Sequence, residues 1–545
     1  MFNNFVLNLK NEFRGYNSNS LVKDMLSGLT VTAVALPLAL AFGVSSGATA
    51  ASGMITAIFA GIVIGLLGGA SYQISGPTGA MTAVLVPIAI QFGIQGILVA
   101  GFISGIILLI AGIFKFGHIV NYIPMPVITG FTSGIAVIIA LGQVDNFFGT
   151  VSKGKNAIEK IASYSKLGFN PHLSTISIGL LVIFVMILWP KKLNNIFPSS
   201  LAGLIIAVIV SSLGNLHVAV VGNIPAKLVL NDRLNFATLS LENIKAIIMP
   251  SISIAALAMI ESLLCGSAGG TMKNEKFNAD QELIAQGIGN IIIPILGGVP
   301  ATAAIARTSV GIKSGCQTRF TSVFHSIGLI ISMFLLAPIM SRIPLAALAG
   351  VLIVTAWRMN DWNRISNIFS RKFKGAIWKF ILTMAATIFF DLTTAIIIGT
   401  LFSLILFIAR ISDIDITISD VHPERLSGND IDMQKLKNTK VIYFTGPLYF
   451  GTSDKLTKAM SELDNASLII LSMRGIPMID VSCAITLHKC IRELNAKGVE
   501  VVFSAVQPKV EEMLKRTDTS NVINNGNIFW STDEALASIL DKKVV

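Results

Sequence analysis

Charged residues are scarce in this chain of 545 residues. They make up 13% of it, about half of the roughly 25% that soluble domains carry, and this deficit excludes an ordinary water-soluble protein. Hydrophobic residues make up 53% and recur in long apolar runs, many of them near the roughly 20 residues that a helix needs to span a bilayer. The composition therefore predicts a polytopic α-helical membrane protein that lies in a lipid bilayer.

Cysteine is also rare. Cys265, Cys316, Cys483 and Cys490 show neither metal-ligand spacing nor a paired framework, so they are predicted to be reduced thiols. The chain lacks a Gly-rich phosphate loop and a nucleophile–base constellation, and no enzyme is predicted. The polar, amphipathic residues 1–23 lack a cleavable signal pattern and are predicted to be a cytosolic segment that lies on the membrane surface.

Charge is divided unevenly along the chain. Residues 1–410 hold 26 Lys and Arg against 12 Asp and Glu, whereas residues 411–545 hold 15 against 18. The basic residues of the first part lie in loops between apolar runs, where they set membrane orientation, so no nucleic-acid partner is predicted. Most of these loops fall on one side, which is predicted to be cytoplasmic, although the four lysines of residues 152–166 disagree.

The apolar runs form two sets of seven, separated by a polar stretch at 214–244. They lie near residues 25–43, 49–69, 77–92, 94–114, 119–144, 173–189 and 198–213, and then 246–265, 281–296, 299–310, 321–340, 344–357, 376–390 and 392–410. We therefore predict a transmembrane domain over 24–410, with about 14 segments and with repeats at about 24–213 and 246–410. After a linker at 411–437, the βαβα pattern of residues 438–545 predicts a small cytosolic α/β domain.

Each set contains one short segment that is marked by glycine and proline and lies third in order. The first is "SGPTGAMTAV" at 75–84 and the second is "GGVPATAAIARTSV" at 297–310. An odd number of spans in each half gives the halves opposite orientations. Matching interruptions then favour 7+7 inverted repeats with two half-helices that meet inside the membrane. The alternative is that glycine and proline only kink two long spans.

A helix that begins inside the membrane leaves its first-turn amides without acceptors. Pro77 and Pro300 are predicted to lie in the first turns of helices 77–92 and 300–310, because proline suits that position. Two such N-termini facing each other form an anion site from N–H donors and helix dipoles. The hydroxyls of Thr78 and Thr302 are predicted to add donors.

Ionisable residues inside apolar runs are functional candidates. Glu261 either binds a coupling cation, carries a proton or pairs with Arg307, which is the one basic residue well inside a run. Arg307 compensates the charge of the anion or of Glu261, and a purely structural ion pair between the two is the alternative. Asp145 and Asp391 lie at run ends and are predicted to be interfacial.

These segments resemble the SulP sulfate-permease family of anion transporters, whose members carry a C-terminal STAS domain. The resemblance covers nearly the whole chain and is carried by "DMLSGLTVTAVALPLALAFGVSSG", "QISGPTGAMT", "ESLLCGSAGG", "NADQELIAQGIGNIIIPILGGVPATAAIARTSVGIKSGCQTR" and the tail. It implies a core domain that moves like an elevator against a gate domain, and a homodimer. With the orientation set by the basic loops, we expect a plasma (inner) membrane location with a cytoplasmic N-terminus and STAS domain.

The resemblance also implies site residues. In addition to Thr302, the residues expected to contact the anion are Leu38, Phe42, Thr78, Gly79, Ala80, Ala303, Ala304, Ala306 and Arg307. Some animal members have glutamine at the position of Leu38, so a polar contact is missing here. Glu261 occupies the position at which the similar cyanobacterial bicarbonate transporters bind sodium, which makes Na+ a candidate coupling ion alongside H+. In the tail, "MIDVSCAITL" resembles the phosphoacceptor turn of STAS domains with Ser482 as acceptor, although Cys483 replaces the usual glycine and an N-cap-like structural role for Ser482 is favoured.

The function predicted from these features is secondary transport of a small inorganic or carboxylate anion of the sulfate or bicarbonate class, coupled to Na+ or H+. One alternative is an uncoupled channel or exchanger for chloride or dicarboxylates. The other is a membrane-embedded sensor whose STAS domain signals to a cytosolic partner.

Overall fold

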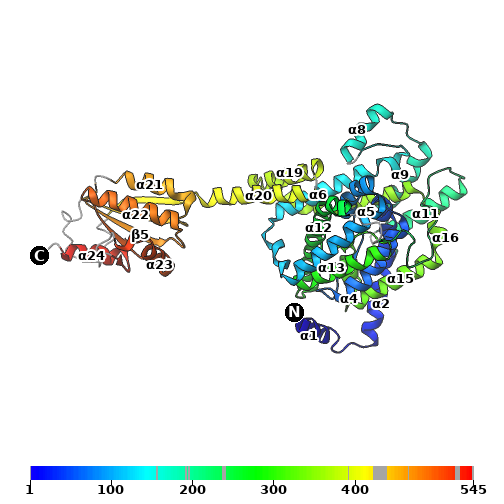
Figure 1. Ribbon diagram of the computed structural model, residues 1–545, viewed down its shortest axis with the longest axis horizontal. Helices are drawn as coiled ribbons and strands as arrows, with labels where there is room; N and C mark the ends of the chain where they lie inside the picture. The colour runs from blue at the N-terminus through cyan, green and yellow to red at the C-terminus, as the bar shows by residue number, and fades with distance from the viewer. Residues whose placement is uncertain are drawn as a thin grey trace. The chain divides into compact units, whose positions relative to one another are not determined.

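The computed structural model contains two compact units, Met1–Leu401 and Phe402–Val545, which are treated separately (Figure 1). It describes residues 2–154, 157–190, 193, 197–235, 241–390, 392–421, 438–463, 466–521 and 528–542. Asp391, which is predicted to be interfacial, lies outside the described residues, as does the 422–437 part of the predicted linker.

The first half of the membrane unit is almost entirely helical. Its elements are α1 (Phe2–Glu12), α2 (Ser18–Ser45), α3 (Ala50–Phe59), the π-helical turn η1 (Ala60–Ile64), α4 (Gly65–Leu67), β1 (Ser75–Gly76), α5 (Gly79–Ile113), η2 (Phe116–Tyr122), α6 (Met125–Gly142), α7 (Val144–Phe148), α8 (Ala157–Leu167), α9 (Leu173–Leu188) and α11 (Ser199–Leu213). Gly93 interrupts α5 with φ of 67°, so the helix divides into two segments where the sequence predicts two runs.

The second half follows the same order of long and short segments. Its elements are α12 (Leu241–Lys273), α13 (Ala279–Ile295), β2 (Thr302–Ala303), α14 (Ile305–Lys313), α15 (Phe320–Leu335), α16 (Ala337–Met340), α17 (Leu345–Met359), α18 (Trp362–Ser370), α19 (Lys374–Phe389) and α20 (Leu392–Ile411). The halves interlock, because α5 packs mainly on α13 and α12, and α2 packs on α15.

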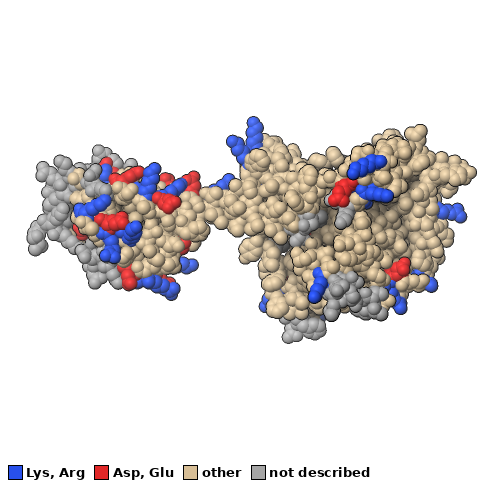
Figure 2. Space-filling model, turned by 45° about the horizontal axis from the view of Figure 1, so that its top comes forward, with Lys and Arg blue, Asp and Glu red and all other residues tan. Residues whose placement is uncertain are grey.

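Six helices of the described residues are long and apolar enough to cross a membrane. They lie at Ser18–Ser45, Ala50–Leu67, Gly79–Ile113, Met125–Phe148, Lys245–Lys273 and Thr394–Ile411, and four shorter apolar helices accompany them. Large apolar side chains such as Phe184 and Leu188 point outward, as expected of a surface that contacts lipid. Figure 2 shows that one face of this unit carries few charged side chains. The polytopic helical fold is as predicted, and the number of spans stays a prediction.

The predicted starts of the two half-helices are wrong. The sequence places Pro77 and Pro300 in first helical turns, but α5 begins at Gly79 and α14 at Ile305. Both prolines lie instead in extended chain beside β1 and β2, which pair with each other in antiparallel register. Proline disfavours helical backbone in the residue before it, and the β1–β2 pairing gives the unwound backbone hydrogen-bond partners.

The first turns of α2 are fastened to the start of α15 through Asp24, an acid that the sequence predictions do not include. Asp24 is fully buried and accepts hydrogen bonds from the backbone N–H groups of Gln317 and Thr318 at 2.6 and 3.0 Å. It also accepts hydrogen bonds from the hydroxyls of Tyr16, Thr318 and Thr321. Asp24 thus ties α2 to the start of α15, where an anionic side chain also favours the helix N-terminus, and Tyr16 joins the chain before α2 to the same carboxylate.

The Asp24→Asn variant is expected to lose about 1–3 kcal/mol of stability, because the amide turns a donor toward buried N–H and O–H groups that need an acceptor. Thermal unfolding of the purified protein in detergent measures this loss. Asp232→Asn, at an exposed aspartate of the same unit, is the control and should leave the melting temperature unchanged. Equal melting temperatures for the Asp24 variant and the wild type would contradict this account of the network.

The second unit is an α/β domain built on a five-stranded sheet in the order β3-β4-β5-β6-β7. The strands are β3 (Asp415–Asp420), β4 (Thr439–Thr445), β5 (Leu468–Gly475), β6 (Glu500–Ser504) and β7 (Ile528–Phe529), and only the β3–β4 pair is antiparallel. Helices α21 (Ser453–Ser461), α22 (Val481–Ala496) and α23 (Pro508–Arg516) bury apolar side chains against one face, and α24 (Thr532–Lys542) packs on the other. The short helices are η5 (Phe450–Thr452) and η6 (Thr519–Asn521).

Two predictions for the tail need correction. Part of the expected linker, Asp415–Asp420, is β3, because all six of its residues pair with Lys440–Thr445 of β4. Ser482 is not the N-cap of its helix, because Asp480 takes that position and accepts a 2.8 Å hydrogen bond from the N–H of Cys483. Ser482 lies in the first turn of α22 and is exposed.

Candidate functional site

The two interrupted segments meet as a short antiparallel ribbon. Ser75 pairs with Ala303 and Gly76 with Thr302, and each strand leads within three residues into a helix, α5 or α14. We call residues 75–78 and 301–304 the two arms. The antiparallel direction of the arms fits halves of opposite orientation, and it brings the N-termini of α5 and α14 to the same small region.

The two helix starts differ in how they are capped. Thr78 is the N-cap of α5, and its hydroxyl oxygen accepts from the N–H of Met81 at 3.3 Å. Ala304 is the N-cap of α14 and provides no side-chain hydrogen bond. The first-turn N–H groups of α14 therefore have no side-chain cap, and they remain donors that an anion can use.

The predicted hydroxyl donors are tied to α12. The Thr78 hydroxyl donates to Oε2 of Glu261 at 2.9 Å, and the Thr302 hydroxyl lies 2.9 Å from Ser262 Oγ. The N–H of Ala303 also donates to Ser262 Oγ, at 3.2 Å. Two adjacent residues of α12 thus engage one arm each, and donation from these hydroxyls to an anion stays a prediction.

Arg307 lies between the arms and is 1% exposed. One Nη donates to the carbonyl oxygen of Pro77, whereas Nε and the other Nη have no hydrogen-bond partner among the described residues. A Cβ placed on Gly76 would lie 2.2 Å from that second Nη, so the glycine makes room for the guanidinium. A buried cation with two free donors is what an anion needs from its binding site.

The structure does not contain the ion pair between Glu261 and Arg307 that the sequence analysis gives as an alternative. No carboxylate of the described residues lies within 4.0 Å of the Arg307 guanidinium, and Glu261 is held by Thr78 instead. Each charge therefore stays available to a mobile ion of opposite sign, because buried charges need compensation.

The remaining predicted residues lie around the N-terminus of α5, with the exception of Ala306. A Cβ on Gly79 would lie 3.1 Å from the Phe42 ring and 2.4 Å from Ile139 Cδ1, so these side chains enclose the start of α5. Leu38 is buried on α2, one turn before Phe42, and Ala80 is fully buried. Ala306 is exposed and is not enclosed by the residues of the two arms.

Sequence reasoning missed Ser262 and Ile139. Ser262 directly follows Glu261 in "MIESLL", and this adjacency is the one signal that was available for it. Ile139 lies within an apolar run with no distinguishing neighbour, so only the packing of α6 against α5 identifies it.

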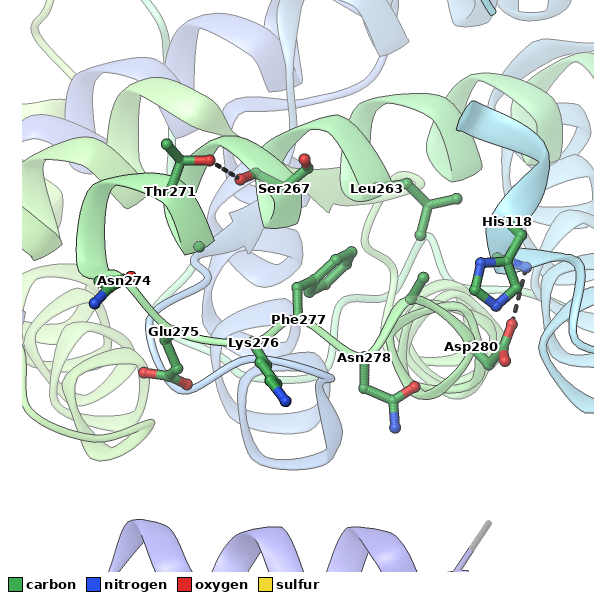
Figure 3. A pocket seen from close by; sticks show the side chains of 13 residues that line it. His118, Leu263, Ser267, Thr271, Asn274, Glu275, Lys276, Phe277, Asn278 and Asp280 are labelled. Carbon is green, nitrogen blue, oxygen red and sulfur yellow. Dashed lines mark hydrogen bonds between the residues drawn. The ribbon is translucent and has the colours of Figure 1, made fainter. Parts of the chain in front are cut away.

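A large open cavity of about 740 Å³ lies away from these residues, at the end of α12, the start of α13 and η2. Figure 3 shows His118, Phe277 and Asp280 along its wall, with a hydrogen bond from the Gly117 N–H to Asp280 Oδ1 of 2.9 Å. It shares no residue with the predicted anion site. The charged residues of its lining, Glu275, Lys276 and Asp280, are all at least partly exposed, whereas Arg307 is buried.

Two helix N-termini that meet beside a buried cation, inside a polytopic helical unit, define a membrane transport protein with an attached α/β domain. The chain belongs to the sulfate permease family, whose family model matches residues 21–386. A STAS-domain model matches residues 430–535.

Similarity to known proteins extends over the full chain. The chain is 32% identical to YvdB of Bacillus subtilis (strain 168), whose name assigns it to sulfate transport, over 96% of this chain and 98% of that protein. It is 26% identical to the bicarbonate transporter BicA of a Picosynechococcus species, over 94% of each chain. The solved structure of the murine Solute Carrier 26 family member A9 anion transporter matches with a TM-score of 0.86 at 16% identity, over 99% of this chain and 95% of that one, which shows a common fold.

These findings confirm the predicted family, the helical membrane fold with a STAS domain, and the prediction that the chain is a transporter and not an enzyme. The chain is a multi-pass anion transporter of the sulfate permease family.

Proposed function

We propose that the protein is a secondary active transporter that binds a small anion between the N-termini of α5 and α14. The observation that carries this proposal is Arg307, a buried guanidinium with two unpartnered donor nitrogens that is held against the opposite arm. The uncapped first turn of α14 supplies further N–H donors beside it. The anion would contact the backbone at Gly79, Ala80, Ala303 and Ala304, with Phe42 packing on one side.

The charges of the site limit the kind of anion. Each helix N-terminus contributes roughly half a positive charge, Arg307 contributes one, and an ionised Glu261 removes one. A single negative charge, as on bicarbonate, balances this sum of about one. Sulfate carries two charges and would need one more positive charge in the site, either a cation bound at Glu261 or a proton on it. The names of the relatives, which include sulfate and bicarbonate transport, fall within this class.

Glu261 is proposed to couple the anion to Na+ or H+. Its carboxylate receives the Thr78 hydroxyl and has no cationic partner in the structure described, so a cation bound there would also be near the arm that carries the anion. We further propose an elevator-like movement of the core domain, a homodimer, and a plasma (inner) membrane location with the N-terminus and STAS domain in the cytoplasm. The orientation follows from the basic loops.

The test is uptake by the full chain reconstituted into liposomes, with bicarbonate, sulfate, a dicarboxylate and chloride offered separately. Sodium and pH gradients are imposed one at a time. We expect accumulation of bicarbonate or sulfate only when one of the gradients is present. Uptake that equilibrates without a gradient would identify the uncoupled channel or exchanger instead, and no uptake of any anion would favour the sensor.

A further inference from the structure

Helix α13 carries a buried polar face that the proposed site does not use. Glu282, Gln286 and Asn290 recur every four residues in "ADQELIAQGIGN", and all three are 0% exposed. Residues four apart lie on one face of a helix, so these side chains form a continuous row, which we call the α13 ladder. Polar side chains buried in a membrane helix are costly unless they are partnered, and such residues commonly mark function.

Different residues of the ladder bind different arms: Asn290 binds the second arm and Gln286 binds the first. Asn290 pairs with the backbone of Ala301 through two hydrogen bonds: the Ala301 N–H donates to Oδ1 at 2.7 Å, and Nδ2 donates to the Ala301 carbonyl at 2.9 Å. This pairing imitates a neighbouring β-strand and fixes the chain directly before β2. Gln286 Nε2 donates to the Ser75 hydroxyl of β1 at 2.9 Å.

Glu282 binds the chain that precedes the first arm. Its Oε2 accepts from the N–H of Gly69, six residues before Ser75, at 3.0 Å, and its Oε1 accepts from Gln286 Nε2 at 2.9 Å. The side chains of Glu282 and Gln286 are therefore linked, and Asn290 Nδ2 donates to the backbone carbonyl of Gln286 at 2.9 Å. One helix face thus contacts both arms and the chain before the first arm. Gln286 is bound to the first arm by one hydrogen bond, because its Oε1 has no partner among the described residues.

The helix that carries the ladder is itself held rigidly. A Cβ on Gly287 would lie 2.5 Å from the backbone nitrogen of Leu109, and one on Gly105 would lie 2.7 Å from that of Ile291. Helix α13 therefore packs on the second segment of α5 at backbone contact, with no side chain between them. A rigid support of this kind transmits small changes in spacing directly.

We propose that Glu282, Gln286 and Asn290 are positioning residues that set the separation of the two arms, and through it the size of anion that fits between the two helix starts. The inference rests on the proposed function. Displacing β1 relative to β2 changes the distance between the first-turn amides of α5 and α14, and misplacing such donors by about 1 Å has a large effect on binding. The ladder thus acts on selectivity without contacting the anion.

The test compares Gln286→Ala, Ser75→Ala and the double variant in liposomes, with bicarbonate and sulfate as probes. Both single variants are expected to raise the KM of at least one anion about tenfold and to change the ratio of the two KM values at least threefold. Both remove the hydrogen bond between Gln286 and Ser75, and Gln286→Ala also removes the bond to Glu282, so the double variant should be no worse than Gln286→Ala alone. If Gln286→Ala fails to fold, Ser75→Ala alone still reports on the bond.

Gln281→Ala is the matched control. Gln281 is a buried amide on the same helix whose Nε2 donates to the Leu67 carbonyl, outside both arms, so its loss should leave the KM ratio unchanged. Ladder variants that lower only the amount of folded protein or kcat, with an unchanged KM ratio, would reduce the ladder to a structural brace and overturn the proposal. Failure of the proposed function itself would appear separately, as wild-type liposomes that accumulate neither anion.

Discussion

Arg307→Ala is expected to raise the KM for anion uptake at least about a hundredfold while the protein still inserts and folds. The substitution removes a buried positive charge and two donor nitrogens that have no partner among the residues that the structure describes. Hydrogen bonds to charged groups contribute about 1.5–3 kcal/mol each, so the loss of two corresponds to a factor of a hundred or more. The concentration dependence of uptake into liposomes measures the change.

Two further variants separate binding from folding. Arg307→Lys keeps the charge but loses the planar fork of donors, so its KM should lie between those of the wild type and the alanine variant. Arg358→Ala is the matched control, because Arg358 also donates to a carbonyl oxygen, that of Met186, but lies away from the arms. A wild-type KM in Arg307→Ala would remove this residue from the anion site.

Gly76→Ala tests the same contact without touching the arginine. The added methyl would lie 2.2 Å from a guanidinium nitrogen and must displace it, so anion affinity should fall in the same direction. An unchanged affinity would show that the position of the guanidinium does not matter for binding.

Glu261→Gln is expected to abolish the effect of the driving cation, so that the ratio of uptake with and without the gradient falls to about one. Glutamine keeps the shape of the side chain, and its carbonyl oxygen can still accept the Thr78 hydroxyl. It has no negative charge to bind Na+ and no proton to release at physiological pH. Initial uptake rates at stepped sodium concentrations and at stepped pH measure the dependence.

Glu275→Gln is the control for this loss of a carboxylate. Glu275 is partly exposed, pairs with Lys273 at 3.2 Å and lies beyond the end of α12, so its variant should keep the full gradient dependence. A retained dependence in Glu261→Gln would assign Glu261 a structural role, with Thr78 as its partner.

Thr78→Val should also weaken the dependence of uptake on the cation gradient, because it removes the hydroxyl that orients the Glu261 carboxylate.

Much of the membrane unit could be predicted from the sequence, because a bilayer imposes its demands locally. A helix that crosses lipid must be apolar over its own length, so the runs near 25–43 and 392–410 correspond to α2 and α20 without knowledge of their neighbours. The interruptions at Gly76 and Pro300 were visible for the same reason, since irregular backbone in lipid needs a local signal. The helix starts were misplaced because β1 and β2 are partners far apart in sequence, and their pairing extends the chain past each proline.

The polar contacts of the site could not be predicted in this way. Thr78, Thr302 and Arg307 were recognised as polar groups in apolar surroundings, but each has several potential partners within the unit. The four-residue spacing of Glu282, Gln286 and Asn290 is visible in the sequence. A row of polar residues within an apolar run does not indicate which residues it contacts, so the ladder was not predicted.

The sequence by itself determined that this chain lies in a membrane, that it has two sets of apolar segments with one interruption in each, and that a soluble α/β domain follows. Only the tertiary structure decided that Glu261 binds Thr78, that Arg307 rests on the Pro77 carbonyl, and that α13 holds both arms. The physical reason is the distance along the chain over which each property is decided. Burial in lipid depends on the composition of each segment alone. The partner of a buried polar group depends on which segments, far apart in the sequence, pack together in the fold.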